Sequence, residues 1–184
     1  MIHATTQVRV ANLATAVDLA KGWADRVISF ADPKTELPNF HTWHHVIRCL
    51  DTEALSDPWA PQRHDIEQAL DFCVPLSNIL VHCEGGISRS TAFAIGLLAR
   101  ADFSIPDITI PEAVRLVGQQ SPNMFPNKLI LRHLESILQL DGFFVQQVAS
   151  SMEQLPKGLW LWCNECQVHF DDEDGHNCPH GLWT

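Results

Sequence analysis

The chain has 184 residues, 46% of them hydrophobic and 18% charged, which suits one globular domain with a small addition. Its formal net charge of −10 argues against general binding to nucleic acids, because that binding requires a basic surface. No apolar run is long enough to span a membrane, and the first twenty residues contain no export signal, so we expect a cytoplasmic protein whose six cysteines are reduced.

The first half of the chain predicts strands that alternate with helices. Short apolar or alternating runs predict strands at 7–10, 26–31 and 44–50, and helical spacing of apolar residues predicts helices at 14–23 and 61–74. Residues 32–42, between the second and third strands, contain two prolines among polar residues. This composition indicates a loop, which can form one wall of a substrate pocket.

The second half of the chain predicts one more strand, followed only by helices. Residues 79–81 form an apolar run typical of a buried strand, and 91–101 is apolar on nearly every face, which favours a buried helix. Strands that alternate with helices imply an α/β fold with a mostly parallel sheet covered on both faces. The remaining helices are predicted at 111–120, 127–140 and 143–155.

The connection between the strand at 79–81 and the helix at 91–101 carries the strongest chemical signal. It reads His82-Cys83-Glu84-Gly85-Gly86-Ile87-Ser88-Arg89-Ser90. Two glycines allow a turn that points successive N–H groups to one place, where the helix dipole also favours negative charge. The same field stabilises a thiolate, which makes Cys83 a candidate nucleophile rather than an ordinary buried cysteine.

Two residues that follow the cysteine suit phosphoryl transfer. Arg89, on the first turn of the helix, can hold two oxygens of a phosphoryl group while the thiolate attacks phosphorus. The hydroxyl of Ser90 can hydrogen-bond the sulfur when the sulfur later departs as a leaving group.

Cys83, Arg89 and Ser90 at this spacing, preceded by His82, resemble the signature of the cysteine-dependent protein tyrosine phosphatases, closest to the dual-specificity type. The resemblance covers about residues 1–150. It implies a phosphatase domain at 1–155, with a four- to five-stranded, mostly parallel sheet flanked by helices. It also implies hydrolysis of phosphate monoesters through a phosphocysteine, without a catalytic cofactor. The substrate-binding residues are then Glu84, Gly85, Gly86, Ile87, Ser88 and Arg89.

A carboxylic acid that faces the cysteine can protonate the departing oxygen of the ester. Asp51 follows the third predicted strand, 32 residues before Cys83, and the carboxyl ends of parallel strands are where ligands bind. This placement is similar to that of the general-acid aspartate of dual-specificity phosphatases. Asp57 and Asp65 are its competitors, and Asp51 can alternatively cap a loop.

Two residues have supporting roles in this interpretation. His82, directly before the nucleophile, is expected to orient the loop by hydrogen bonding. Asn127 matches a supporting position of the family, or it is only the cap of the helix that follows it.

The acidic Glu84 inside the loop disfavours a strongly anionic lipid head group, so the expected partner is a phosphorylated protein. Phosphotyrosine and phosphoserine or phosphothreonine both remain open. Two other functions are considered: a phosphoprotein-binding module without turnover, and sulfur or arsenate chemistry on a similar loop. The loop length and the mid-chain position of Cys83 argue against the second.

Residues 156–184 form a different kind of sequence, in which cysteines and histidines cluster. A Cys-x2-Cys pair can present two thiolates to one metal, and four such ligands suit a tetrahedral structural zinc. A segment this short has too small a hydrophobic core to fold alone, and a bound metal would supply the missing stability. The pattern resembles a small zinc ribbon, although a flexible acidic tail or a redox-active pair are alternatives. The predicted ligands are Cys163, Cys166, Cys178 and either His176 or His180.

Overall fold

The computed structural model describes residues 6–40, 42–73, 77–100, 108–140, 142–155, 161–163 and 168–170. The chain forms two compact units, Met1–Glu153 and Gln154–Thr184. The strands of the first unit are β1 (Gln7–Asn12), β2 (Arg26–Ala31), β3 (Trp43–Arg48) and β4 (Asn78–Cys83). Its helices are α1 (Leu13–Ala20), α2 (Arg63–Phe72), α3 (Arg89–Leu98), α4 (Ile110–Gln120), α5 (Lys128–Leu138) and α6 (Phe144–Glu153).

The four strands form one sheet in the order β1-β4-β2-β3, with every neighbouring pair parallel. The expected parallel sheet flanked by helices is therefore confirmed, with four strands in the first unit's described residues. Because the strands are parallel, their carboxyl ends lie along one edge of the sheet. That edge carries the segments that follow β2, β3 and β4, which are the segments that build the site.

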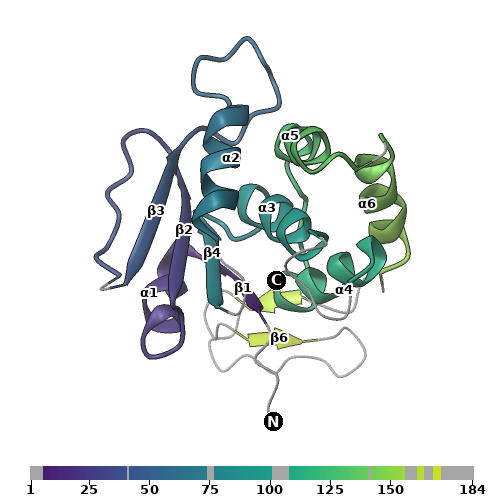
Figure 1. The fold of residues 1–184 in the computed structure, drawn as a ribbon. Helices are drawn as coiled ribbons and strands as arrows, with labels where there is room; N and C mark the ends of the chain where they lie inside the picture. Colours follow the sequence, from purple (N-terminus) through teal and green to yellow (C-terminus); the bar gives the residue numbers. More distant parts are fainter. Residues whose placement is uncertain are drawn as a thin grey trace, which may run out of the picture. The chain divides into compact units, whose positions relative to one another are not determined.

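Helices cover both faces of this sheet, with α1 on one side and α2 and α3 on the other (Figure 1). Successive side chains of a strand point to opposite faces. Leu80 of β4 packs with Ala16 and Ala20 of α1, so His82, two residues further, faces the same side. Cys83 consequently faces the side of α3.

Helix α3 is the most enclosed element, since every one of its residues is buried. It packs against β1, β2 and β4 on one side and against α4 and α5 on the other. Gly96 permits the close approach of α5, because a Cβ atom there would lie 2.6 Å from Cδ1 of Leu134. The buried helix holds Arg89 and Ser90, in its first turn, in a fixed place.

The second unit contains two short antiparallel strands, β5 (Leu161–Cys163) and β6 (Val168–Phe170). Cys163 ends β5 and pairs with Val168. The other predicted zinc ligands, Cys166, His176, Cys178 and His180, lie outside the described residues. Across the described part of the chain, no helix has the length and apolar character needed to cross a membrane.

Candidate active site

Residues 84–88 form a loop, here called the 84–88 loop, that joins β4 to α3. Its carbonyl groups turn outward, because four of the five accept hydrogen bonds from neighbouring segments. The pairs are Leu13 N to Glu84 O (3.1 Å), Ser121 Oγ to Gly86 O (2.8 Å), Phe125 N to Ile87 O (2.9 Å) and Asn127 N to Ser88 O (3.3 Å). No N–H group of the loop donates to a described residue, so these amides are free to bind an anion.

Gly86 allows the loop to close tightly against β1. Its φ angle is +67°, in the left-handed region, and a Cβ atom would lie 2.8 Å from backbone atoms of Ala11 and Asn12. Any side chain at this position would push the loop away from the sheet. The glycine predicted to permit a tight turn is therefore required here for space as well as for conformation.

Cys83 ends β4 and lies beneath the 84–88 loop, with only 3% of its surface exposed. Its Sγ atom lies 3.1 Å from Oγ of Ser90, which is fully buried. Two other thiols are free and buried, but burial raises the pKa of Cys49 and of Cys73 to about 12. Neither is a thiolate at neutral pH, which leaves Cys83 as the candidate nucleophile among the described cysteines of the first unit.

The Sγ atom opens onto a cavity of about 460 Å³. The cavity is formed by the 84–88 loop, by the segment that follows β3, and by the turn before α5. Its lining residues are Asp51, Glu53, Cys83, Glu84, Gly85, Ile87, Ser88, Arg89, Phe125 and Asn127. All the predicted catalytic and loop residues except the buried Ser90 and Gly86 therefore border one cavity.

Arg89 is 4% exposed, and its Nη1 atom donates to Oδ1 of Asp32 (2.6 Å) and to the Cys49 carbonyl (2.7 Å). These two bonds fix the plane of the guanidinium group. Its Nε atom is buried and has no partner among the described residues. An unpaired buried donor of a charged group is costly, so this N–H is suited to an anionic oxygen in the cavity.

The ion pair with Asp32 also secures the charge of Arg89. Burial by itself would lower the pKa of the guanidinium, but the hydrogen bond to Asp32 and the nearby Cys83 outweigh it and raise that pKa. Asp32 was not among the predicted site residues. It directly follows β2, and the predicted loop at 32–42 contributes to the site through this carboxylate.

Asp51 borders the cavity beside the loop and is held by two donors. Its Oδ1 atom accepts hydrogen bonds from Ser88 Oγ (2.8 Å) and from Asn127 Nδ2 (2.9 Å). Asn127 also caps α5, because its Oδ1 accepts from the N–H groups of Leu129 and Ile130. Asn127 therefore caps α5 and also hydrogen-bonds Asp51, so one side chain ties α5 to Asp51.

The competing carboxylates are engaged elsewhere. Asp57 accepts a hydrogen bond from the Trp59 N–H (2.8 Å), and Asp65 pairs with His64 (2.9 Å); neither lines the cavity. Glu53, which sequence reasoning missed, does line it and accepts a bond from the Lys128 N–H (3.1 Å).

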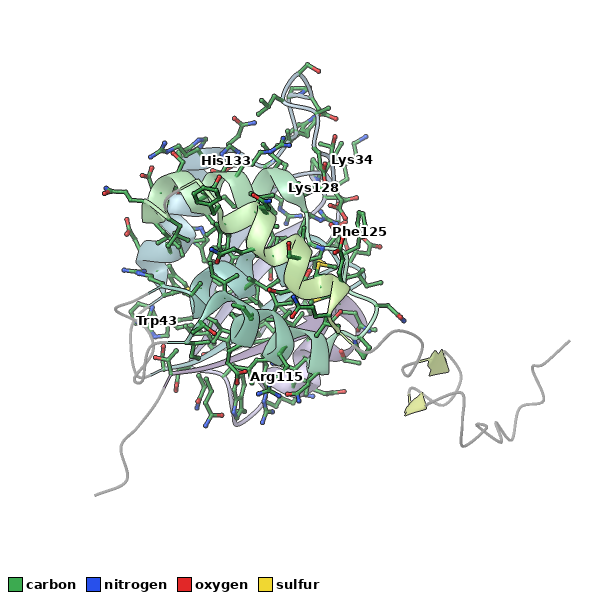
Figure 2. All side chains as sticks on the ribbon, turned by 90° about the vertical axis from the view of Figure 1, so that its right-hand side faces the viewer. Lys34, Trp43, Arg115, Phe125, Lys128 and His133 are labelled. Carbon is green, nitrogen blue, oxygen red and sulfur yellow. The ribbon has the colours of Figure 1, made fainter. Side chains whose placement is uncertain are left out.

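Apolar side chains form part of the cavity rim. Phe125 is 65% exposed and Ile87 is 41% exposed, and they are joined by a backbone hydrogen bond. Phe125 projects from the surface, close to Lys128 in projection and far from Trp43 (Figure 2). An exposed aromatic ring at the mouth of a cavity is typical of a ligand contact.

His82 is 1% exposed and faces away from the cavity, on the α1 side of the sheet. Its Nε2 atom lies 2.5 Å from Oγ of Ser29. Burial, with the nearby His44, lowers the pKa of His82 to about 4, while the backbone of Cys83 opposes the shift. The His82 ring is therefore uncharged at pH 7, so it cannot act there as an imidazolium acid.

The buried His82 predicts that folding is linked to protonation. Its pKa is about 4 in the folded chain and 6.5 ordinarily, so the unfolded chain binds more protons between these values. As the pH drops from 6.5 to 4, protonation of His82 should lower the free energy of unfolding by up to about 3 kcal/mol. Above pH 6.5, His82 should have no effect on the free energy of unfolding. Urea unfolding at pH 7.5, 6 and 5 measures this slope. The slope should be smaller in His82→Gln; an equal slope in both proteins would contradict the assignment.

Comparisons with known proteins support the fold. No protein-family model matches the sequence, and no curated protein is significantly similar to it. The human tyrosine phosphatase-like serine/threonine/tyrosine-interacting protein has a TM-score of 0.55 at 19% identity, over 72% of this chain and 91% of that one. DUSP15 has a TM-score of 0.54 at 17% identity, over 85% of this chain and 97% of that one. The Yvh1 phosphatase domain of Chaetomium thermophilum has a TM-score of 0.50 at 22% identity, over 73% of this chain and 90% of that one. The chain thus has the fold of dual-specificity and tyrosine phosphatases.

Proposed function

We propose that this protein is a phosphoprotein phosphatase, of tyrosine or dual specificity, that hydrolyses phosphate monoesters through a phosphocysteine. One observation carries the proposal: among the described residues, the buried Nε–H of Arg89 has no acceptor and the 84–88 amides donate to no group, while four of the loop's five carbonyls are bound by neighbouring segments. Donors without acceptors suit a group with several anionic oxygens. Cys83 lies at the same cavity, where its sulfur can reach the phosphorus of such a group.

In the first step the Cys83 thiolate attacks phosphorus, forming a sulfur–phosphorus bond as the bond to the ester oxygen breaks. The amides of the 84–88 loop and the guanidinium of Arg89 hold the equatorial oxygens, where charge is greatest in the transition state. Asp51, held by Ser88 and Asn127, donates a proton to the departing oxygen.

In the second step water attacks the phosphocysteine. Asp51, now a carboxylate, accepts a proton from that water, and the sulfur departs as a thiolate. The Ser90 hydroxyl, 3.1 Å from Sγ, can donate a hydrogen bond to the departing sulfur and so stabilise it. Inorganic phosphate is released and Cys83 is regenerated.

The charge of the rim supports a protein substrate rather than an inositol lipid. Glu53 and Glu84 are both exposed at the cavity and would repel additional phosphate groups. The exposed ring of Phe125 can pack against the phosphorylated side chain or its neighbours. A phosphorylated side chain presents one phosphate on an uncharged stem, which fits this arrangement.

A phosphoprotein-binding module without turnover is the second candidate, and the neighbour named a tyrosine phosphatase-like interacting protein motivates it. Hydrolysis of an aryl phosphate and of a phosphotyrosine peptide separates the two. We expect the wild-type chain to release phosphate from both. Tight peptide binding with no release of phosphate would favour the binding module.

Asp51→Asn is expected to slow hydrolysis by roughly 10²–10⁴-fold, the range of general acid catalysis, and to flatten the alkaline limb of the pH–rate profile. The loss should be smaller for esters whose leaving oxygen is already a stable anion, because these need no proton. Steady-state rates on a series of aryl phosphates measure both effects.

Asp57→Asn is the matched control, since it makes the same change in the same connecting segment. A loss of this kind in Asp57→Asn, or in Glu53→Gln, with Asp51→Asn nearly unaffected, would show that the acid is a different carboxylate.

We also propose that the tail, residues 156–184, binds one structural zinc through Cys163, Cys166, Cys178 and either His176 or His180. The antiparallel pairing of β5 with β6 supports this, because Cys163 ends one strand and Cys166 follows three positions later in the sequence. Two thiolates so close in the chain suit a tetrahedral metal. When bound, zinc would stabilise the fold of the tail.

Protein purified without chelator or histidine tag should contain about one equivalent of zinc by elemental analysis, since structural sites bind too tightly to be emptied. Cys163→Ser should lower the zinc content, while phosphatase activity need not change. Less than about a tenth of an equivalent in the wild type, with the tail still resistant to protease, would refute the site.

A further inference from the structure

A hydrogen-bonded chain of three side chains crosses the sheet behind Cys83. Oγ of Ser29, on β2, lies 2.7 Å from Nε2 of His44 and 2.5 Å from Nε2 of His82. Ser29 is fully buried, and His82 is nearly so. His44, on β3, is half-buried and forms the end of the chain nearer to solvent.

The strand register produces this alignment. Ser29 pairs directly with His82 across β2 and β4, and Val27, two residues earlier on the same face, pairs with His44. The ring of Phe40 packs on both imidazoles, 4.8 Å from that of His44 and 5.1 Å from that of His82. The chain is thereby enclosed between the sheet and an aromatic side chain.

The proton count of the hydroxyl restricts how the chain can be arranged. Ser29 has one hydroxyl proton, so it can donate to only one of the two nitrogens and must accept from the other. If both rings donated, the buried hydroxyl proton would have no acceptor among the described residues, at a cost of roughly 1–3 kcal/mol. The ring that accepts from Ser29 must carry its own proton on Nδ1.

We propose that Ser29 and His44 are positioning residues for Cys83: His44 donates to Ser29, Ser29 donates to His82, and the proton of His82 is thereby fixed on Nδ1, facing the backbone of Cys83. The proposal rests on the proposed function only in taking Cys83 as the nucleophile.

Two observations select this direction of the chain over its reverse. The backbone of Cys83 favours a proton on the His82 ring, although Nδ1 makes no hydrogen bond of good geometry with a described residue. His44 is also the ring that solvent can reach, so His44 can keep its Nε2 proton whether it is neutral or charged. The reverse direction would require neutral His44 and would leave the buried Nδ1 of His82 without a proton.

The consequence lies at the nucleophile. An N–H dipole aimed at the end of β4 stabilises negative charge on Cys83, in addition to the loop amides and the helix dipole. Without the chain, the His82 proton is free to move to Nε2, and this dipole is lost.

Long-range ¹H–¹⁵N spectra of the histidine rings test the assignment directly, because they distinguish the two neutral forms of an imidazole. At pH 7 the wild type should show His82 protonated on Nδ1 and His44 protonated on Nε2. In Ser29→Ala, His82 should shift toward the Nε2 form. Alkylation of Cys83 by iodoacetamide at pH 7 should slow by about ten-fold, with a similar fall in kcat and little change in KM.

The two variants of His44 supply a second test, which decides the question if Ser29→Ala does not fold. His44→Gln keeps a donor N–H and should stay close to the wild type, whereas His44→Leu removes it and should resemble Ser29→Ala. Ser151→Ala removes a buried hydroxyl from α6 and is the control.

An Nε2 proton on His82 in the wild type, or alkylation rates that are equal in Ser29→Ala and Ser151→Ala, would overturn the proposal. The readouts of ring protonation and alkylation do not require turnover. A wild type that hydrolyses no phosphate ester but shows both effects would therefore refute the proposed function and support the positioning chain.

Discussion

Cys83→Ser is expected to abolish turnover, with a loss on the order of 10⁴-fold or more, while a phosphotyrosine peptide still binds. The serine hydroxyl is protonated at neutral pH and cannot attack phosphorus in the way a thiolate does. The groups that would hold the phosphate, the 84–88 amides and Arg89, are unchanged by the substitution. The site is rigid around this position, since Cys83 ends a central strand and is 3% exposed.

Rates of aryl phosphate hydrolysis and a peptide-binding titration together measure this result. Cys73→Ser is the matched control, because it makes the same exchange at a buried thiol outside the cavity. Substantial residual hydrolysis in Cys83→Ser, with Cys73→Ser or Cys49→Ser inactive, would mean that another thiol is the nucleophile.

Arg89→Lys is expected to lose at least about 10²–10³-fold in kcat, even though the charge is retained. The guanidinium uses Nη1 to bind Asp32 and Cys49, which leaves its other donors, Nε among them, for the phosphoryl group. A single ammonium cannot satisfy Asp32 and also grip two substrate oxygens in one plane.

The same exchange at the surface, Arg115→Lys, provides the control, because Arg115 pairs only with the exposed Glu112 among the described residues. Thermal unfolding of both variants separates a lost contact with substrate from lost stability. Near wild-type activity in a folded Arg89→Lys would contradict the role given to the guanidinium plane.

The strands and helices of the first unit were predictable because each depends on the pattern of neighbouring residues in the chain. Apolar runs and helical spacing located each strand and helix of the first unit to within a few residues. Strand order is different, because it depends on long-range pairing that no local pattern contains. Long-range pairing places β4 between β1 and β2, and this puts Cys83 on a central strand of the sheet.

The loop from Cys83 to Arg89 was visible because its residues are contiguous in the chain. Asp51 was predicted from its position after a strand and Asn127 from its position at a helix start, and both line the cavity. Asp32 was missed, although it also directly follows a strand, so the same rule applied to β2 would have found it. The rule would not have shown that Asp32 binds Arg89, because that contact spans 57 positions.

Two other features could not be read from the sequence. Phe125 lies between the helices predicted at 111–120 and 127–140, and it reaches the cavity because its N–H donates to the Ile87 carbonyl. Ser29 and His44 lie within strands at positions typical of ordinary core or edge residues. Their significance comes only from the register that sets them beside His82.

Detection of the phosphocysteine tests the central claim most directly. Ser90→Ala should slow the second step, because the departing sulfur loses its hydroxyl donor 3.1 Å away, and the intermediate should therefore accumulate. The reaction with an aryl phosphate is quenched with acid within one turnover, and the digested protein is analysed by mass spectrometry. We expect one added phosphoryl group on the peptide that contains Cys83, formed in a burst stoichiometric with the released phenol. Phosphate release that proceeds in the wild type while Cys83 is never modified, or while the phosphoryl group is found on another residue, would contradict the account.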